Sequence, residues 1–158
     1  MDLQQGTPEW LKARQQKITA SVVAALFGKH PFKDVASLVG HLRTPYDETK
    51  PKEKSFAMSW GTIFEDRARQ LYEAATGTKV RETGFWLMQN APLLSQTEPY
   101  CGPPFCGGSP DGIVDSFPGE NGTGIIEIKS PHTSKLPKKM SEQFMHIFQL
   151  VMNMYCTG

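Results

Sequence analysis

Apolar residues recur at three- and four-residue spacing in five stretches of the chain, a period that indicates amphipathic helices. The predicted helices cover residues 7–17, 19–28, 34–43, 59–77 and 141–158. Thr7 is a suitable N-cap with Pro8 at the first helical position. Thr19 is expected to cap the second helix and Gly28 to end it. The first third of the chain is therefore expected to be helical.

The predicted helix over residues 59–77 is the longest, and its apolar positions form one stripe, made of Phe64, Ala68, Leu71, Tyr72 and Ala75. Gly77 is a suitable C-cap. Glu65 lies beside the stripe, near its edge, where a carboxylate can have a functional use. The alternative is a surface pair with Arg69 at i,i+4, which is worth only about 0.2–0.5 kcal/mol.

Short runs of β-formers bounded by turn residues predict strands in the second half of the chain. Residues 78–88 are expected to form one or two strands, and residues 109–116 and 122–130 a hairpin joined by the turn-forming FPGENG segment. Residues 44–57 and 91–108 are rich in polar, Pro or Gly residues and are expected to be loops.

Helices first, a small sheet next and a helix last indicate an α/β (α+β) fold, with a central mixed β-sheet flanked by helices. A length of 158 residues fits one domain. A mixed sheet of this kind normally adds a strand after the last helix, so we expect residues 1–158 to be a single domain that is incomplete at its C-terminus.

Composition narrows the protein class only slightly. The net charge of +1 leaves nucleic-acid binding open, and the short basic run of Lys135, Lys138 and Lys139 is more often a solvated loop than a binding patch. Three cysteines without dense spacing argue against a disulfide framework. No apolar run approaches bilayer length, so an intracellular protein without a membrane partner is expected, in the nucleus or the cytoplasm.

The predicted hairpin carries the most informative chemistry. Alternate residues of a strand share a face, so Glu127 and Lys129 are expected to point together, with Asp111 at the start of the partner strand. Two converging carboxylates repel unless a proton or cation lies between them. Oxygen ligands suit Mg²⁺ or Mn²⁺, and a nearby ammonium can stabilise charge on a phosphate. An exposed strand face beside an ordinary turn is the simpler alternative.

These segments resemble a known family. SPDGIVD followed by GIIEIKSP is similar to the core of the PD-(D/E)xK nucleases, in particular the YqaJ-like viral recombinase (lambda exonuclease) family. ARQQKITAS, WGTIFEDRARQLYEAATGTKVRETGFW and FQLVMNMYCTG resemble three further family motifs, in the family's order. The resemblance covers roughly residues 10–158, and it implies the restriction-endonuclease-like fold.

The resemblance also implies roles for particular residues. Asp111, Glu127, Glu65 and the Ile128 carbonyl match the family's metal ligands, and Lys129 its catalytic lysine. Gln149 matches a glutamine near the active centre, with Gln143 as the candidate if the helix register differs; Val151 stands where the family has a companion glutamine. Arg14 and Ser21 match a pair that binds the terminal 5′-phosphate of DNA. Ser21 is expected in the first turn of a helix, where free N–H groups favour an anion; a cap beside Thr19 and a solvated Arg14 are the alternative.

The implied function is a Mg²⁺-dependent exodeoxyribonuclease, with Mn²⁺ as a substitute and one or two ions in the site. Its expected substrate is duplex DNA with a free 5′ end, digested 5′ to 3′ in recombination or repair. A single-strand annealing protein and a ring-shaped homo-oligomer are the partners that the family suggests. The alternatives are an endonuclease acting on structured DNA or RNA, a DNA-binding module without turnover, and a structural domain that binds Ca²⁺ through Asp111 and Glu127.

Overall fold

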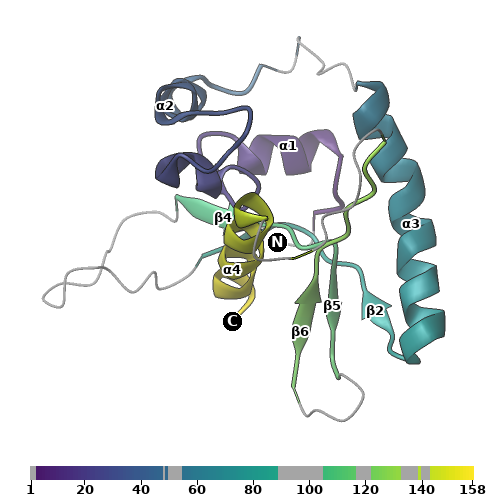
Figure 1. The fold of residues 1–158 in the computed structure, drawn as a ribbon. Coiled ribbons are helices and arrows are strands. Elements are labelled where there is room, and N and C mark those ends of the chain that lie inside the picture. The colour runs from purple at the N-terminus through teal and green to yellow at the C-terminus, as the bar shows by residue number, and fades with distance from the viewer. Residues whose placement is uncertain are drawn as a thin grey trace, which may run out of the picture. The chain divides into compact units, whose positions relative to one another are not determined.

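A computed structural model of the chain describes residues 3–47, 49, 55–88, 105–116, 122–132, 139 and 143–158. The chain divides into two compact units. The first unit consists of Met1–Tyr46, Gly84–Ser109 and Phe144–Gly158, and the second of Asp47–Thr83 and Pro110–Gln143. Figure 1 labels helices α1 to α4 and strands β2, β4, β5 and β6. Each unit contains a three-stranded sheet, so the strands of this α+β fold lie in two small sheets.

The first unit begins with the predicted helix α1 (Pro8–Arg14), where the Thr7 side chain accepts a hydrogen bond from the Trp10 N–H as the N-cap. Helix α2 (Val35–Arg43) is also confirmed, and Asp34 caps it together with Ser37. The last helix, α4 (Phe144–Thr157), is confirmed and begins three residues inside the predicted range.

The predicted helix over residues 19–28 is wrong in its first half. Ile18–Thr19 form strand β1, and only Val23–Phe27 are helical, as the short 3₁₀ helix η1. Thr19 is therefore a strand residue and not a cap, because the backbone N–H groups on either side of it bond to strand β4. Gly28 ends η1 in a left-handed conformation (φ 62°), as predicted.

The sheet of the first unit has the order β1–β4–β3, with β4 (Cys106–Gly108) parallel to β1 and antiparallel to β3 (Trp86–Leu87). The sequence predicted a loop over β4. Its glycines are poor strand formers, but the packing requires them, since a Cβ on Gly107 would lie 2.4 Å from the Phe85 ring. One on Gly108 would lie 2.3 Å from Asn153 of α4.

The first unit has two small apolar cores. One joins Ala20 to Met152 and Cys156 of α4, and the other joins Val22 and Ala25 to Leu38 of α2. Helix α4 packs against β4 and η1. Helix α4 is apolar along most of its length, so its packing against these elements contributes hydrophobic stabilisation to this unit.

The second unit contains the longest helix, α3 (Phe56–Thr76), capped by Ser55 and ended by Gly77 (φ 71°). Its sheet has the order β2–β5–β6, all antiparallel, from β2 (Val80–Arg81), β5 (Gly112–Val114) and β6 (Gly124–Ile126). The predicted hairpin is thus confirmed, although residues 117–121 of its turn lie outside the described residues. Figure 1 shows α3 running beside this sheet, next to β2.

The predicted apolar stripe of α3 is covered only in part. Ala68 and Tyr72 are half-covered, but Leu71 is 57% exposed, and no residue of α3 is fully buried. Arg69 and Glu73 are half-covered as well, because an ion pair and a hydrogen bond connect them to the segment that follows the helix.

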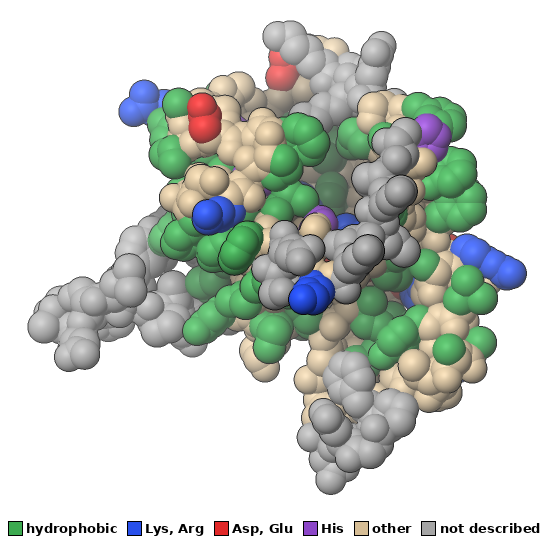
Figure 2. Space-filling model, in the orientation of Figure 1, with side chains coloured by type: hydrophobic (Ala, Val, Ile, Leu, Met, Phe, Trp, Pro, Cys, Tyr) green, Lys and Arg blue, Asp and Glu red, His purple; other side chains and the backbone are tan. Residues whose placement is uncertain are grey.

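No helix among the described residues is both long and apolar enough to cross a bilayer. Figure 2 shows hydrophobic and polar side chains interspersed over the visible face of the described parts.

Candidate active site

The hairpin of the second unit brings its two carboxylates to the same end. Asp111 directly precedes β5 and Glu127 directly follows β6, and the register pairs Gly112 with Ile126. The Asp111 N–H donates to the Ile126 carbonyl (3.1 Å). The Asp111 carboxylate then accepts a hydrogen bond from the Ile128 N–H at 2.6 Å. The backbone of one strand therefore fixes the acid of the other.

Gly112 explains part of the Pro-Asp-Gly sequence. A Cβ at this position would lie 2.2 Å from Cγ1 of Val80 in β2, so strand β2 can approach β5 only because residue 112 has no side chain. The neighbouring Asp111 is held at the edge of a sheet that is closely packed on this side. Sequence inspection identified the turn but gave no signal for this contact.

Glu127 and Lys129 share one face, as the strand period predicts. The Lys129 ammonium lies 2.5 Å from Oε1 of Glu127. The Glu127 side chain is only 4% exposed, whereas that of Lys129 is 40% exposed. The lysine thus covers a nearly buried carboxylate while its own charge stays in contact with solvent, which is incompatible with the simple exposed-face alternative for Glu127.

Electrostatic repulsion links these acids to Glu65 of α3. Burial first, and then the charge of Asp111, raise the pKa of Glu127 to about 7, although Lys129 lowers it. Burial raises the pKa of Asp111, against the hydrogen bond from Ile128 and the charge of Lys129. Burial and the charge of Asp111 also raise the pKa of Glu65. Three carboxylates therefore destabilise one another's charged forms around one lysine.

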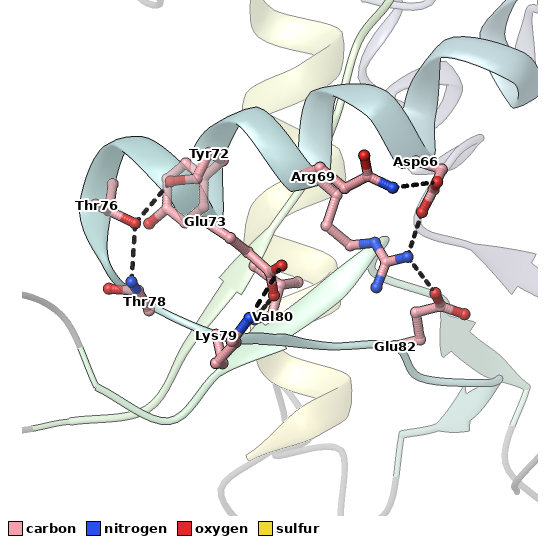
Figure 3. Close-up of polar contacts among 10 residues, drawn as sticks. Asp66, Arg69, Tyr72, Glu73, Thr76, Thr78, Lys79, Val80 and Glu82 are labelled. Carbon is pink, nitrogen blue, oxygen red and sulfur yellow. Dashed lines mark hydrogen bonds and ion pairs between the residues drawn. The ribbon is translucent and has the colours of Figure 1, made fainter.

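The alternative use of Glu65, a pair with Arg69, is absent. Among the residues that the structure describes, Arg69 forms ion pairs with Asp66 and with Glu82 (2.7 Å), and none with Glu65. Figure 3 shows Arg69 reaching from α3 toward both acids. Glu65 is half-covered, and its carboxylate interacts with the hairpin acids.

The chemistry of these donors fits a hard cation. Carboxylates whose pKa values are raised, first by burial and for Glu127 also by the charge of Asp111, favour the binding of a proton or a divalent ion. As they stand, no three His, Cys, Asp or Glu side chains of the described ranges converge closely enough to hold a metal ion. The Asp111 carboxylate is directed to the Ile128 N–H, and Glu127 to Lys129.

The first unit brings the second predicted pair together. The Arg14 guanidinium donates to the Ser21 hydroxyl at 3.1 Å and lies 3.9 Å from the centre of the Trp10 ring. The Ser21 hydroxyl is also 3.1 Å from the Thr19 hydroxyl. Sequence inspection missed Trp10 and Thr19 in this group. The predicted position of Ser21 in the first turn of a helix is wrong, because Ser21 lies in the turn before η1.

Comparison with known proteins identifies the family. The sequence profile of the YqaJ-like viral recombinase domain matches residues 9–158. The chain belongs to the YqaJ-like viral recombinase family. Two similar solved structures are those of LHK-Exo, described as an alkaline exonuclease from Laribacter hongkongensis, alone and in complex with dAMP.

The two structures differ little in their similarity to this YqaJ-like chain. The dAMP complex has 31% sequence identity and a TM-score of 0.65, and the other structure has 32% and 0.61. Each alignment covers 96% of this chain and 69% of LHK-Exo. No protein with curated annotation matches the chain. Family membership and the exonuclease neighbours indicate a nuclease.

The remaining predicted site residues of this YqaJ-like domain lie on or beside helix α4. Gln149 is half-covered in α4 of the first unit, and Gln143 lies just before that helix in the second unit. Their assignment rests on the family resemblance alone. Of the basic run, only Lys139 is among the described residues. The Ile128 N–H has a clear partner in Asp111, and the role of its carbonyl stays a prediction.

Proposed function

We propose that this chain is a divalent-metal-dependent deoxyribonuclease that hydrolyses phosphodiester bonds of linear duplex DNA from a 5′ end. The observation that carries the proposal is the geometry of the hairpin end, where the Ile128 N–H holds the Asp111 carboxylate and Lys129 covers the nearly buried carboxylate of Glu127. A fold rarely gathers three acids in a partly buried place for stability, because each raises the cost of ionising the others.

Asp111, Glu127 and Glu65, with the Ile128 carbonyl, would hold one or two divalent ions, Mg²⁺ or Mn²⁺. Bound there, a divalent ion would supply positive charge to the scissile phosphate. The hydrogen bond from Ile128 would hold Asp111 ionised and oriented. Glu127 would exchange its contact with Lys129 for the cation, because the cation would offset the repulsion of Glu127 by Asp111 and Glu65.

Lys129 would act on the substrate once Glu127 has a new partner. Its ammonium would donate a hydrogen bond to a phosphate oxygen and stabilise the negative charge that grows there during hydrolysis. A partly exposed lysine suits this role, because it can leave the carboxylate and reach a substrate without unfolding any element.

The 5′ end would be recognised in the first unit. Arg14 can place two parallel N–H groups on phosphate oxygens, and the Ser21 and Thr19 hydroxyls can add donors. Stacking on Trp10 holds the guanidinium plane in one orientation. Gln149 would contribute near the active centre, as in the family. The product would be a 3′ single strand for recombination or repair, and an annealing protein and a ring-shaped homo-oligomer are further expectations of this kind.

A direct experiment incubates the protein with end-labelled linear duplex DNA and with closed circular duplex DNA, in Mg²⁺ or in EDTA. We expect release of 5′ mononucleotides from the linear DNA in Mg²⁺ only. Cleavage of the closed circles would show that the chain acts as an endonuclease, because closed circular DNA has no end. Tight DNA binding without cleavage under any metal would identify a module without turnover, and full cleavage in EDTA would contradict the metal-dependent mechanism.

A further inference from the structure

Polar contacts join the C-terminal half of α3 to the segment of β2, as Figure 3 shows, and two of them involve Glu73 and Arg69. In the first, Oε1 of Glu73 accepts a hydrogen bond from the Val80 N–H at 2.8 Å. In the second, the Arg69 guanidinium lies 2.7 Å from Oε1 of Glu82 while it also pairs with Asp66. The Glu73 side chain is 19% exposed.

Strand β2, which receives the hydrogen-bonding contact from Glu73, pairs with strand β5 of the hairpin. Val80 pairs with Val114 of β5, and its Cγ1 occupies the space that a side chain on Gly112 would need. Gly112 directly follows Asp111 in the chain. The strand to which Glu73 binds is therefore in tight contact with the strand that begins at Asp111.

Glu73 and Arg69 share a helix face with Glu65. Positions 65, 69 and 73 are four residues apart, so their side chains project within about 80° of one another around the helix axis. Glu65 lies about 6 Å along the axis from Arg69 and about 12 Å from Glu73. A rotation of α3 by one residue position would turn Glu65 by about 100°, away from the hairpin acids with which it interacts.

We propose that Glu73 is a positioning residue of the active site: its bond to Val80 fixes the rotation of α3 so that Glu65 meets Asp111 and Glu127. Arg69 and Glu82 form a second tie of the same kind. This inference rests on the proposed nuclease function. The hydrogen bond matters more than charge, because Lys79, the cation 3.7 Å from Glu73, is 91% exposed and its attraction is screened by water.

The test compares E73A, which removes the acceptor, with E73Q, which keeps an acceptor oxygen without the charge. The matched control is K79A, which removes only the screened ion pair. For E73A we expect kcat on linear duplex DNA to fall between about 10- and 100-fold with KM unchanged. The Mn²⁺ concentration for half-maximal activity should rise about tenfold. E73Q should regain most of both values, and K79A should stay within about twofold of wild type.

A second variant, E82A, breaks the exposed tie and cannot unfold the sheet, since the Glu82 side chain is 68% exposed. It should change kcat and the half-saturating Mn²⁺ concentration in the same direction, by about threefold. If E73A lowers only the melting temperature, or if E73Q is as impaired as E73A, the positioning role is wrong.

Calorimetric Mn²⁺ titration separates this inference from the proposed function. A wild-type protein that binds Mn²⁺ but cuts no DNA would contradict the proposed function, whereas weaker Mn²⁺ binding by E73A and recovery in E73Q would still support the positioning role. Equal Mn²⁺ affinities in wild type, E73A and E73Q would contradict it.

Discussion

The carboxylate site of the second unit and the arginine site of the first unit are opposites in charge. In the second unit, burial raises the pKa of Asp111 and of Glu127, and the charge of Asp111 raises the pKa of Glu127 further. In the first, the Arg14 guanidinium contacts a hydroxyl and an aromatic ring, neither of which carries a charge. The acids of the one site suit a cation, and the guanidinium of the other suits an anion. A DNA end with its metal ions offers both.

The largest effects are expected from the acids themselves. D111N and E127Q should each reduce cleavage of linear duplex DNA by at least about a thousandfold and weaken Mn²⁺ binding, because an amide carries no charge to attract the ion. Gel analysis of end-labelled DNA and calorimetry measure the two quantities. D115N, at an exposed aspartate just after β5, is the matched control and should behave as wild type. Wild-type cleavage by D111N would contradict the assignment of the active site to the second unit.

Removal of the lysine should separate chemistry from metal binding. K129A should reduce kcat by about a hundredfold or more. Mn²⁺ affinity should stay the same or increase, since the variant removes a positive charge beside Glu127 and Asp111. Single-turnover kinetics and calorimetry test the pair of expectations. Loss of Mn²⁺ affinity in K129A, with normal affinity in D111N, would contradict the assignment of metal binding to Asp111 and of transition-state stabilisation to Lys129.

Glu65 should rank next, because it acts from a helix outside the hairpin. E65Q should lower kcat between about 10- and 100-fold if the carboxylate binds metal, and it should shift the half-saturating Mn²⁺ concentration upward. A silent E65Q, equal to the D115N control in both measurements, would restrict the metal site to the two hairpin acids.

Changes at the arginine site should alter the preference for 5′-phosphorylated ends more than they alter the metal site. Wild type should cut 5′-phosphorylated ends at least about tenfold faster than 5′-hydroxyl ends, because a charge-assisted bidentate contact contributes more than one neutral hydrogen bond. R14A should remove this preference and leave Mn²⁺ affinity unchanged. K12A, which removes a neighbouring charge of α1, should keep the preference. Equal rates on both ends for wild type would make the endonuclease the better assignment.

The smallest effect concerns stability and pH. The pKa of Glu127 rises on folding from 4.5 to about 7, so the folded state binds this proton more tightly than the unfolded chain. Between these values stability should fall as pH rises, by roughly 10 °C in melting temperature in EDTA. Mg²⁺ should raise the melting temperature more at pH 8 than at pH 5.5. E127Q should flatten both trends, and an unchanged profile in E127Q would assign the titration to another group.

Local patterns predicted what depends on neighbours in the chain. The caps at Thr7 and Gly77, the hairpin and the shared face of Glu127 and Lys129 follow from turn chemistry and from the period of a strand. The link between Arg14 and Ser21 came only through resemblance to the family, and their contact agrees with it.

Long-range packing decided what the sequence could not. Strand β4 has glycines where a propensity argument expects a loop, because Phe85 and Asn153 fill the space above them. The covered face of α3 was predicted only in part, because hydrophobic periodicity does not register the polar contacts that Arg69 and Glu73 make with residues that follow a turn. Trp10 escaped notice in the arginine site because an aromatic residue at helical spacing looks like core.

The two ties of α3 should respond differently to ionic strength. The Arg69–Glu82 pair is partly open to water, and salt at 1 M, where the screening length is about 3 Å, weakens it. The Val80 N–H is a neutral donor, so its hydrogen bond to Glu73 depends less on the attraction between charges that salt screens. High salt would thus weaken the contact of α3 with Glu82 and leave its contact with Val80 in place. Part of any salt inhibition would then arise within the protein itself, in addition to the weaker attraction of DNA phosphates.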